Sequence, residues 1–123
     1  MIPVMQTRVG TTGNCYEACL ATLLNLELSD IPDFPREWED FLAAVQRFLL
    51  PLGKFYFQLK PDDPLVESIF ADGLTFHFIE GTSPRGGRHA CVAVNGELLH
   101  DPHPGGTGLV ETDVYGFLGD RLI

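Results

Sequence analysis

Cys15 is the residue of this sequence whose type and position best suit covalent chemistry. It stands at the expected start of a helix, because Asn14 is a favourable N-cap and Glu17 occupies the position of a capping-box acid. Unpaired N–H groups and the macrodipole at a helix N-terminus stabilise an anion, so we expect this position to lower the pKa of the thiol. Since the thiolate is the reactive form, Cys15 is a candidate nucleophile. A purely structural role in the core is the alternative.

The other two cysteines are predicted to be small core residues. Cys19 lies one helical turn beyond Cys15 among leucines, and Cys91 lies in a short apolar strand. Three cysteines cannot all pair, so at least one thiol stays free. The residues after Met1 lack the basic and apolar stretches of a secretory signal, and we therefore expect a cytoplasmic domain.

A histidine and an aspartate stand at the two ends of a predicted hairpin. His89 begins one strand, the chain turns at Asn95-Gly96, and Asp101 follows the second strand. A two-residue turn would send the Asp101 side chain to the face opposite His89, whereas a three-residue loop would set the two side chains against each other. The sequence is compatible with either turn. A catalytic site requires the second register or an equivalent twist.

If these side chains meet, the roles of a thiol hydrolase follow. His89 would take the proton from Cys15 and later return it to the leaving group. Asp101 would accept a hydrogen bond from the far ring nitrogen and support the imidazolium. The developing oxyanion would need two donors, of which the backbone N–H of Cys15 is one. An upstream amide would be the other, with Gln6 as the first choice and Asn14 as the second.

Two other interpretations of these residues are open at this point. One is a zinc site, although cysteine pairs in zinc sites usually come from knuckles rather than from one turn of a helix. Its ligands would be Cys15, Cys19, His100 and His103. The other is a catalytically idle binding module. His77, which lies in an aromatic strand, is predicted to be structural.

Hydrophobic periodicity and turn signals predict the elements that position these residues. The predicted helices span residues 15–26, 35–50 and 64–70. The predicted strands span residues 54–59, 74–79, 89–94 and 97–100, and a last apolar segment spans 114–118. Helices first and mostly antiparallel strands afterwards indicate an α+β fold, with one domain over residues 1–123. The helix that carries the cysteines is apolar on most sides, which places it at the centre.

Composition excludes several classes of protein. The 123 residues are 45% hydrophobic and 20% charged, which is typical of one globular domain. A formal net charge of −9 makes nucleic acid and anionic membrane surfaces poor partners, because phosphate binding needs clustered cations. The apolar runs are too short to span a bilayer. If the protein is the thiol hydrolase described above, we expect a peptide or protein substrate as its partner, and no cofactor or metal.

Two short blocks of the sequence resemble papain-like cysteine peptidases. Residues 13–21 read GNCYEACLA and look like the cysteine-bearing helix start of the compact bacterial branch that includes bacteriocin-leader peptidases. Residues 89–94, HACVAV, and 99–102, LHDP, resemble the histidine strand and the Asp-Pro strand of that group. Small uncharacterised proteins of bacteria and their phages look similar in both blocks. Tyr16 replaces the glycine that often follows the cysteine there, which would narrow the cleft.

The resemblance implies a papain-like fold, in which a thiol on a central helix meets a histidine and an aspartate from an antiparallel sheet. It implies a nucleophile at Cys15, a base at His89 and an orienting acid at Asp101, in the order of the family. It also implies an oxyanion glutamine, and Gln6 is the only glutamine upstream of the cysteine. The implied activity is hydrolysis of a peptide or isopeptide bond through an acyl-enzyme. Deamidation and acyl transfer are alternatives, because only the second nucleophile differs.

Overall fold

The structure is a computed structural model that describes residues 1–122. Within that range, three α-helices and a five-stranded antiparallel sheet confirm the predicted α+β fold. The helices are α1 (Cys15–Leu24), α2 (Trp38–Leu49) and α3 (Pro64–Ala71), and the short 3₁₀ helices are η1 (Gly10–Thr12), η2 (Leu28–Asp30) and η3 (Leu50–Leu52). The strands are β1 (Lys54–Leu59), β2 (Phe76–Thr82), β3 (Arg88–Val94), β4 (Glu97–His100) and β5 (Glu111–Asp120).

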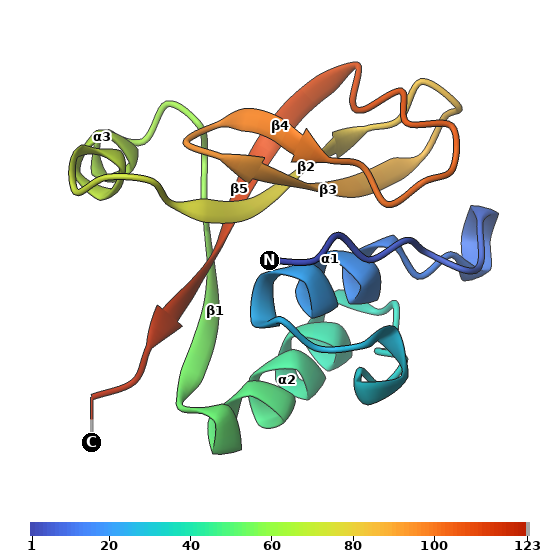
Figure 1. Cartoon of the computed structure of the whole chain (residues 1–123), viewed down its shortest axis with the longest axis horizontal. Coiled ribbons are helices and arrows are strands. Elements are labelled where there is room, and N and C mark those ends of the chain that lie inside the picture. The colour runs from blue at the N-terminus through green and yellow to red at the C-terminus, as the bar shows by residue number, and fades with distance from the viewer. Residues whose placement is uncertain (123) are drawn as a thin grey trace.

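The last strand of the chain lies inside the sheet rather than at its edge. The strand order is β1-β5-β2-β3-β4, so β5 pairs with both β1 and β2. The predicted apolar segment 114–118 is the middle of β5, which extends three residues earlier and two residues later. Helices α1 and α2 lie together on one side of the sheet, and α3 lies apart from them (Figure 1).

The main core lies between α1, α2 and one face of the sheet. Helix α1 is buried along most of its length, as its apolar sequence predicts, and it packs on β3. From α2, only the stripe facing the core is fully buried. The fully buried side chains of this cluster include Leu20, Val45, Leu49, Phe78 and Val92. The opposite face of the sheet carries a second cluster around Cys91, and both Cys19 and Cys91 are buried as predicted.

The predicted N-cap role of Asn14 is wrong. Its side chain makes no hydrogen bond to the first turn of α1. Instead, the Asn14 Oδ1 atom accepts hydrogen bonds from the backbone N–H groups of Thr7 and Arg8, each at 3.0 Å. The side chain therefore holds the N-terminal arm against the start of the helix. The amide oxygen thus binds two backbone N–H groups of the arm rather than those of the helix's first turn.

The predicted capping box fails at Glu17 as well. The Glu17 side chain is 1% exposed and accepts hydrogen bonds from the Phe34 backbone N–H, at 3.0 Å, and from the Arg36 guanidinium, at 3.1 Å. Arg36 also donates to the carbonyl of Gly13, at 2.7 Å. A buried carboxylate needs a paired cation and hydrogen bonds, and these partners meet that need. The ion pair fixes the segment before α2 beside Cys15.

A close backbone approach occurs where β2 crosses β5. A Cβ atom at Gly81 would lie 1.8 Å from the carbonyl oxygen of Glu111. We expect Gly81→Ala to lower the free energy of unfolding by about 3 kcal/mol, because the two strands must separate to admit the methyl group. Urea denaturation measures this loss, with Thr82→Ala at the exposed neighbouring position as the control. If the urea midpoint of Gly81→Ala equalled that of the wild type, the close approach of β2 to β5 at Gly81 would be contradicted.

His77 has the structural role that the sequence predicts. Its ring is buried, Nδ1 donates to the carbonyl of Phe78 at 2.9 Å, and Nε2 accepts from the N–H of Gly96 at 2.9 Å. Both bonds require the neutral ring, since a proton on Nε2 would remove the acceptor. Burial lowers the pKa of His77 below its ordinary value of 6.5.

A pH-dependent stability follows from His77. The unfolded chain takes up the proton more readily than the folded one, so the free energy of unfolding should fall as the pH drops below about 6.5. The His77→Gln variant keeps an acceptor for Gly96 but has no titrating ring, and it should lose this part of the pH dependence. Urea midpoints of both proteins between about pH 7.5 and about pH 5 measure the difference. An equal change of the urea midpoint with pH in both proteins would contradict the role of His77 in this pH dependence.

Candidate active site

The hairpin of β3 and β4 determines whether His89 and Asp101 can meet. Its turn has two residues, Asn95 and Gly96, both with positive φ, at 46° and 84°. The three-residue loop, which would have aligned the two side chains directly, does not form. A β-bulge replaces it: Ala93 pairs with Leu98 and Val92 with His100, so Leu99 is an extra residue in β4.

The bulge at Leu99 changes the face on which Asp101 lies. Successive side chains of a strand alternate between faces, so one extra residue returns Asp101 to the face of His89. The Nε2 atom of His89 lies 2.7 Å from Oδ1 of Asp101, and both side chains are 4% exposed. The structure therefore brings together the histidine and the aspartate that the sequence predicts.

Asp101 is held as a carboxylate in this position. Its Oδ1 atom also accepts from the N–H of His103, at 2.9 Å, and its Oδ2 atom accepts from the N–H of Gly108, at 2.8 Å. Burial opposes ionisation, but the hydrogen bonds from His89 and from these two N–H groups keep the pKa of Asp101 below its ordinary value. With Nε2 of His89 donating to this carboxylate, Nδ1 is the ring nitrogen that can accept a proton.

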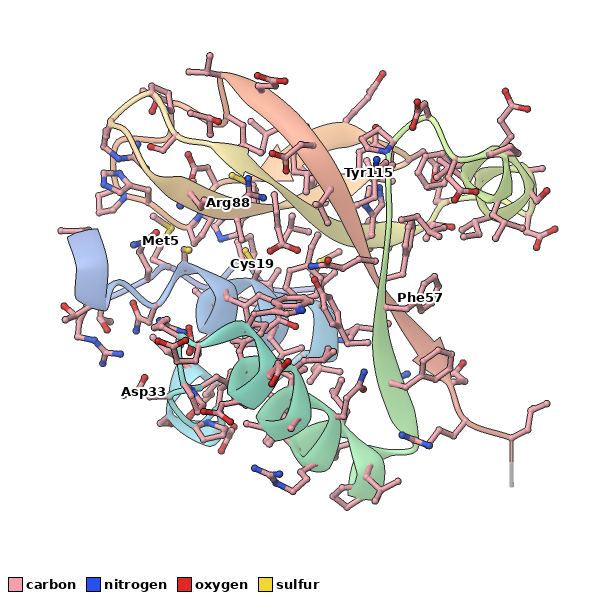
Figure 2. The ribbon with its side chains drawn as sticks, turned by 180° about the vertical axis from the view of Figure 1, so that it is seen from behind. Met5, Cys19, Asp33, Phe57, Arg88 and Tyr115 are labelled. Atoms are coloured by element: carbon pink, nitrogen blue, oxygen red, sulfur yellow. The ribbon has the colours of Figure 1, made fainter. Side chains whose placement is uncertain are left out.

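Cys15 is the first residue of α1 and the most accessible of the three cysteines. The backbone groups of Ala90, which follows His89, and of Tyr16 lower the pKa of its thiol, although burial outweighs their effect. One turn further along α1, the thiol of Cys19 donates to the carbonyl of Ala90 at 3.4 Å. Figure 2 shows Cys19 between α1 and the sheet. This hydrogen bond links α1 to β3 at the residue next to His89.

The predicted lowering of the Cys15 pKa is wrong. Burial raises the pKa of the thiol, and the backbone hydrogen bonds from Ala90 and Tyr16 offset only part of this effect. The nearby carboxylate of Glu17 raises the pKa further. The N-terminus of α1 therefore does not generate the thiolate by itself. A base must remove the proton for Cys15 to act as a nucleophile.

Cys15 and His89 line one pocket of about 990 Å³. Helix α2 contributes the aromatic side chains of Trp38 and Phe41, and the sheet contributes Glu80. A ligand in the pocket would therefore lie against both Cys15 and His89. Its volume is in the range typical of ligand sites.

Gln6 lines the same pocket and is buried. Its backbone N–H donates to the carbonyl of Pro102, at 3.0 Å, which holds the N-terminal arm beside the loop of Asp101. Its Nε2 atom donates to the carbonyl of Arg8, at 2.7 Å, and its Oε1 atom is buried without a hydrogen-bond partner among the described residues. An amide nitrogen carries two protons, so one remains for a ligand in the pocket.

Asn14, the second choice for an oxyanion donor, lies outside this pocket. Its Nδ2 atom donates to the hydroxyl of Thr7, at 2.9 Å, and its Oδ1 atom binds the arm. The structure therefore overturns Asn14 as a candidate. Gln6 lies nine residues before Cys15 in the sequence. The chain between them folds into η1, and the N–H of Asn14 donates a hydrogen bond to the carbonyl of Arg8, so both residues line the same pocket.

The four residues weighed as zinc ligands do not assemble. The Nε2–H of His100 donates to the carbonyl of Val4, at 2.7 Å, and Nδ1 of His103 accepts from the N–H of Gly105, at 2.9 Å. Cys19 is in the core. Over residues 1–122, the single group of three metal-ligating atoms within 4.8 Å of one another consists of His89, Cys91 and Asp101.

Sequence patterns missed two further residues that line the pocket, Glu80 and Trp38. Glu80 continues the alternation of β2 two residues beyond the buried Phe78, and a charged residue at such a core-facing position is a signal for a site. The predicted strand ends at residue 79 and therefore does not include Glu80. Trp38 is the first residue of α2 and is 52% exposed.

Comparisons with known proteins return no relative: no family model, no curated protein and no solved structure matches this chain. Among residues 1–122, no helix has the length and the apolar character needed to cross a membrane. What the protein does is therefore inferred from its own side chains.

Proposed function

We propose that this protein is a papain-like thiol hydrolase that cleaves an amide, in a peptide or an isopeptide bond, through Cys15, His89 and Asp101. The observation that carries the proposal is the 2.7 Å hydrogen bond between His89 Nε2 and Asp101 Oδ1, beside a pocket that His89 shares with the accessible thiol. A cysteine-bearing helix packed on an antiparallel sheet supports the papain-like part of the proposal.

In the first half of the reaction, Nδ1 of His89 takes the proton of the Cys15 thiol as the sulfur attacks the carbonyl carbon of the substrate. A carbon–sulfur bond forms, and the carbonyl π electrons move to the oxygen. When this tetrahedral intermediate collapses, the carbon–nitrogen bond breaks, and His89 delivers its proton to the leaving nitrogen. The products are a free amine and a thioester on Cys15.

In the second half, His89 accepts a proton from a water molecule that attacks the thioester. The new carbon–oxygen bond replaces the carbon–sulfur bond, and the thiol is restored as the acid product leaves. Asp101 stabilises the imidazolium that forms in both halves and fixes the ring orientation. Because burial raises the pKa of Cys15, proton transfer to His89 accompanies the attack on the carbonyl carbon.

Two groups can stabilise the oxyanion. The backbone N–H of Cys15 is among the unpaired donors at the start of α1, and the amide of Gln6 lines the same pocket. The unpartnered Oε1 atom of Gln6 supports a role in ligand binding, because buried polar atoms without partners are rare in folded proteins.

A defined peptide library tests the activity. We would incubate it with the wild-type protein and with Cys15→Ala, and compare the products by mass spectrometry. Hydrolysis predicts new amino termini that only the wild type produces. Deamidation would instead add about 1 Da to intact peptides, and acyl transfer would join two peptides, since all three reactions share the acyl-enzyme. Identical spectra for the two proteins would support the idle binding module.

A further inference from the structure

A second polar cluster lines the same pocket, and the proposed reaction does not use it. At its centre is Glu80, whose Oε2 atom accepts from the hydroxyl of Tyr56, at 2.7 Å, and from Nε2 of Gln58, at 3.5 Å. Both hydrogen bonds go to the same oxygen, so Oε1 has no hydrogen-bond partner within residues 1–122. Gln58 and Glu80 both line the pocket.

A buried hydroxyl without a partner lines the same pocket. Tyr16 is 5% exposed, and its oxygen has no hydrogen-bond partner in the described part of the chain. Its ring stacks on Phe78, with ring centroids 4.6 Å apart, and packs edge to face on Tyr56, the hydrogen-bond donor of Glu80, with centroids 5.7 Å apart. Burial raises the pKa of Tyr16, and the nearby Tyr56 and Glu80 raise it further. A buried polar group without a partner is costly, so a ligand group is the expected occupant.

Two of the three arginines of the pocket are already neutralised by other carboxylates. Arg88 forms two hydrogen bonds with Asp113, both 2.7 Å long, and Arg36 pairs with Glu17. In the chain as described, Glu80 forms no ion pair within 4 Å. The third, Arg85, is on an exposed loop and donates to the hydroxyl of Thr107.

Apolar and aromatic side chains line the same pocket as Glu80. Trp38 stacks on Phe41, with ring centroids 6.0 Å apart, and Val114 lines the sheet side. An occupant that fits this arrangement has an apolar stem and a cationic end. The stem would pack on the aromatic walls, and the cation would bind the free oxygen of Glu80.

We propose that the part of the pocket around Glu80 is a specificity site that binds a basic side chain, arginine or lysine, of the substrate, with Glu80 as the counter-ion and the hydroxyl of Tyr16 as a second contact. The inference rests on the proposed function only in assigning the basic residue to the substrate of Cys15. Binding of the cation itself does not depend on catalysis.

The fluorescence of Trp38 offers a direct test, because it is the one tryptophan of the chain and lines the pocket. We would titrate the Cys15→Ala protein with Nα-acetylarginine amide, Nα-acetyllysine amide and the amide of acetylated citrulline, an uncharged isostere of arginine. Arginine and lysine should bind about tenfold more tightly than citrulline. Equal affinities for arginine and citrulline, or no saturable signal, would overturn the inference.

Two variants assign the effect to the proposed groups. Glu80→Gln keeps the shape of the side chain and should weaken arginine binding about tenfold, and Tyr16→Phe should weaken it severalfold. Glu67→Gln, on the exposed surface of α3, makes the same change of charge away from the pocket and should have no effect. Unchanged arginine affinity in Glu80→Gln would contradict the site.

The outcome is separable from that of the peptide library. Selective binding of arginine, together with no peptide cleavage by the wild-type protein, would support the specificity site and reject the hydrolase. Peptide cleavage with no preference for basic residues would do the reverse.

Discussion

Alkylation of Cys15 by iodoacetamide near pH 7 should be about a hundredfold slower in His89→Ala than in the wild type. Burial raises the pKa of this thiol above its ordinary value of 9.0, so the thiolate is rare at neutral pH unless a base assists. In the variant, the rate should continue to rise beyond pH 9. In the wild type, a plateau should appear at lower pH, because His89 removes the proton.

Mass spectrometry of peptides measures the rate at each cysteine separately. The buried Cys19 and Cys91 serve as internal references, and both should stay unlabelled while the protein is folded. His103→Ala is the matched control, since its ring also lines the pocket, with a centroid 6.1 Å from that of His89. Superimposable pH profiles for the wild type and His89→Ala would contradict the role of His89 as the base.

Asp101→Ala should slow the alkylation of Cys15 at pH 7 by at least about tenfold. The substitution removes the 2.7 Å hydrogen bond that orients His89 and supports its imidazolium form. Deletion of Leu99 should instead leave this rate close to that of the wild type. The ladder without the extra residue still pairs His100 with Val92, so Asp101 stays on the face of His89.

Leu99→Ala is the matched control for the side chain at the bulge. The leucine is exposed, so this substitution should leave the reactivity of Cys15 unchanged. Circular dichroism checks that each variant remains folded. Asp101→Asn keeps the shape of the side chain but removes its charge, and it should also slow the alkylation of Cys15. A folded Asp101→Ala protein that reacts at the wild-type rate would contradict the role of Asp101.

The sequence predicted the elements well because their hydrophobic patterns are strong. Helix α1 is apolar on most sides, which predicted both the helix and its central place, and the periodic apolar residues of the α2 segment predicted a helix there. Cys15, His89 and Asp101 were identifiable from their residue types and their positions at the ends of elements. Their order along the chain, Cys-His-Asp, also matches that of the family that the sequence resembles.

The register that brings His89 and Asp101 together was not predictable from the same patterns. A bulge at Leu99 leaves no trace in hydrophobic alternation, because β4 has only four residues and its side chains are mostly exposed. Asp101 is held in place by the backbone N–H groups of His103 and Gly108, which only the folded loop supplies. Hydrogen bonds that form only in the folded chain therefore determine the position of Asp101 relative to His89.

The start of α1 shows the same limit. Asn14 and Glu17 have the residue types and spacing of a capping box, but each binds a segment elsewhere in the chain. Local propensity is a weak prior when a buried partner competes for the same side chain. The burial that raises the pKa of Cys15 is likewise a property of the packed molecule, and a helix position cannot reveal it.

The central claim is that Cys15 and His89 act together to form and hydrolyse an acyl-enzyme. Its most direct test is the reaction with p-nitrophenyl acetate, followed by release of nitrophenol and by the mass of the intact protein. We predict a burst of nitrophenol, transient acetylation of Cys15 and continued turnover, with both acylation and turnover lost in Cys15→Ala and strongly slowed in His89→Ala. Acetylation of Cys15 that proceeds equally fast without His89, or an acetyl group that is never released, would contradict the claim.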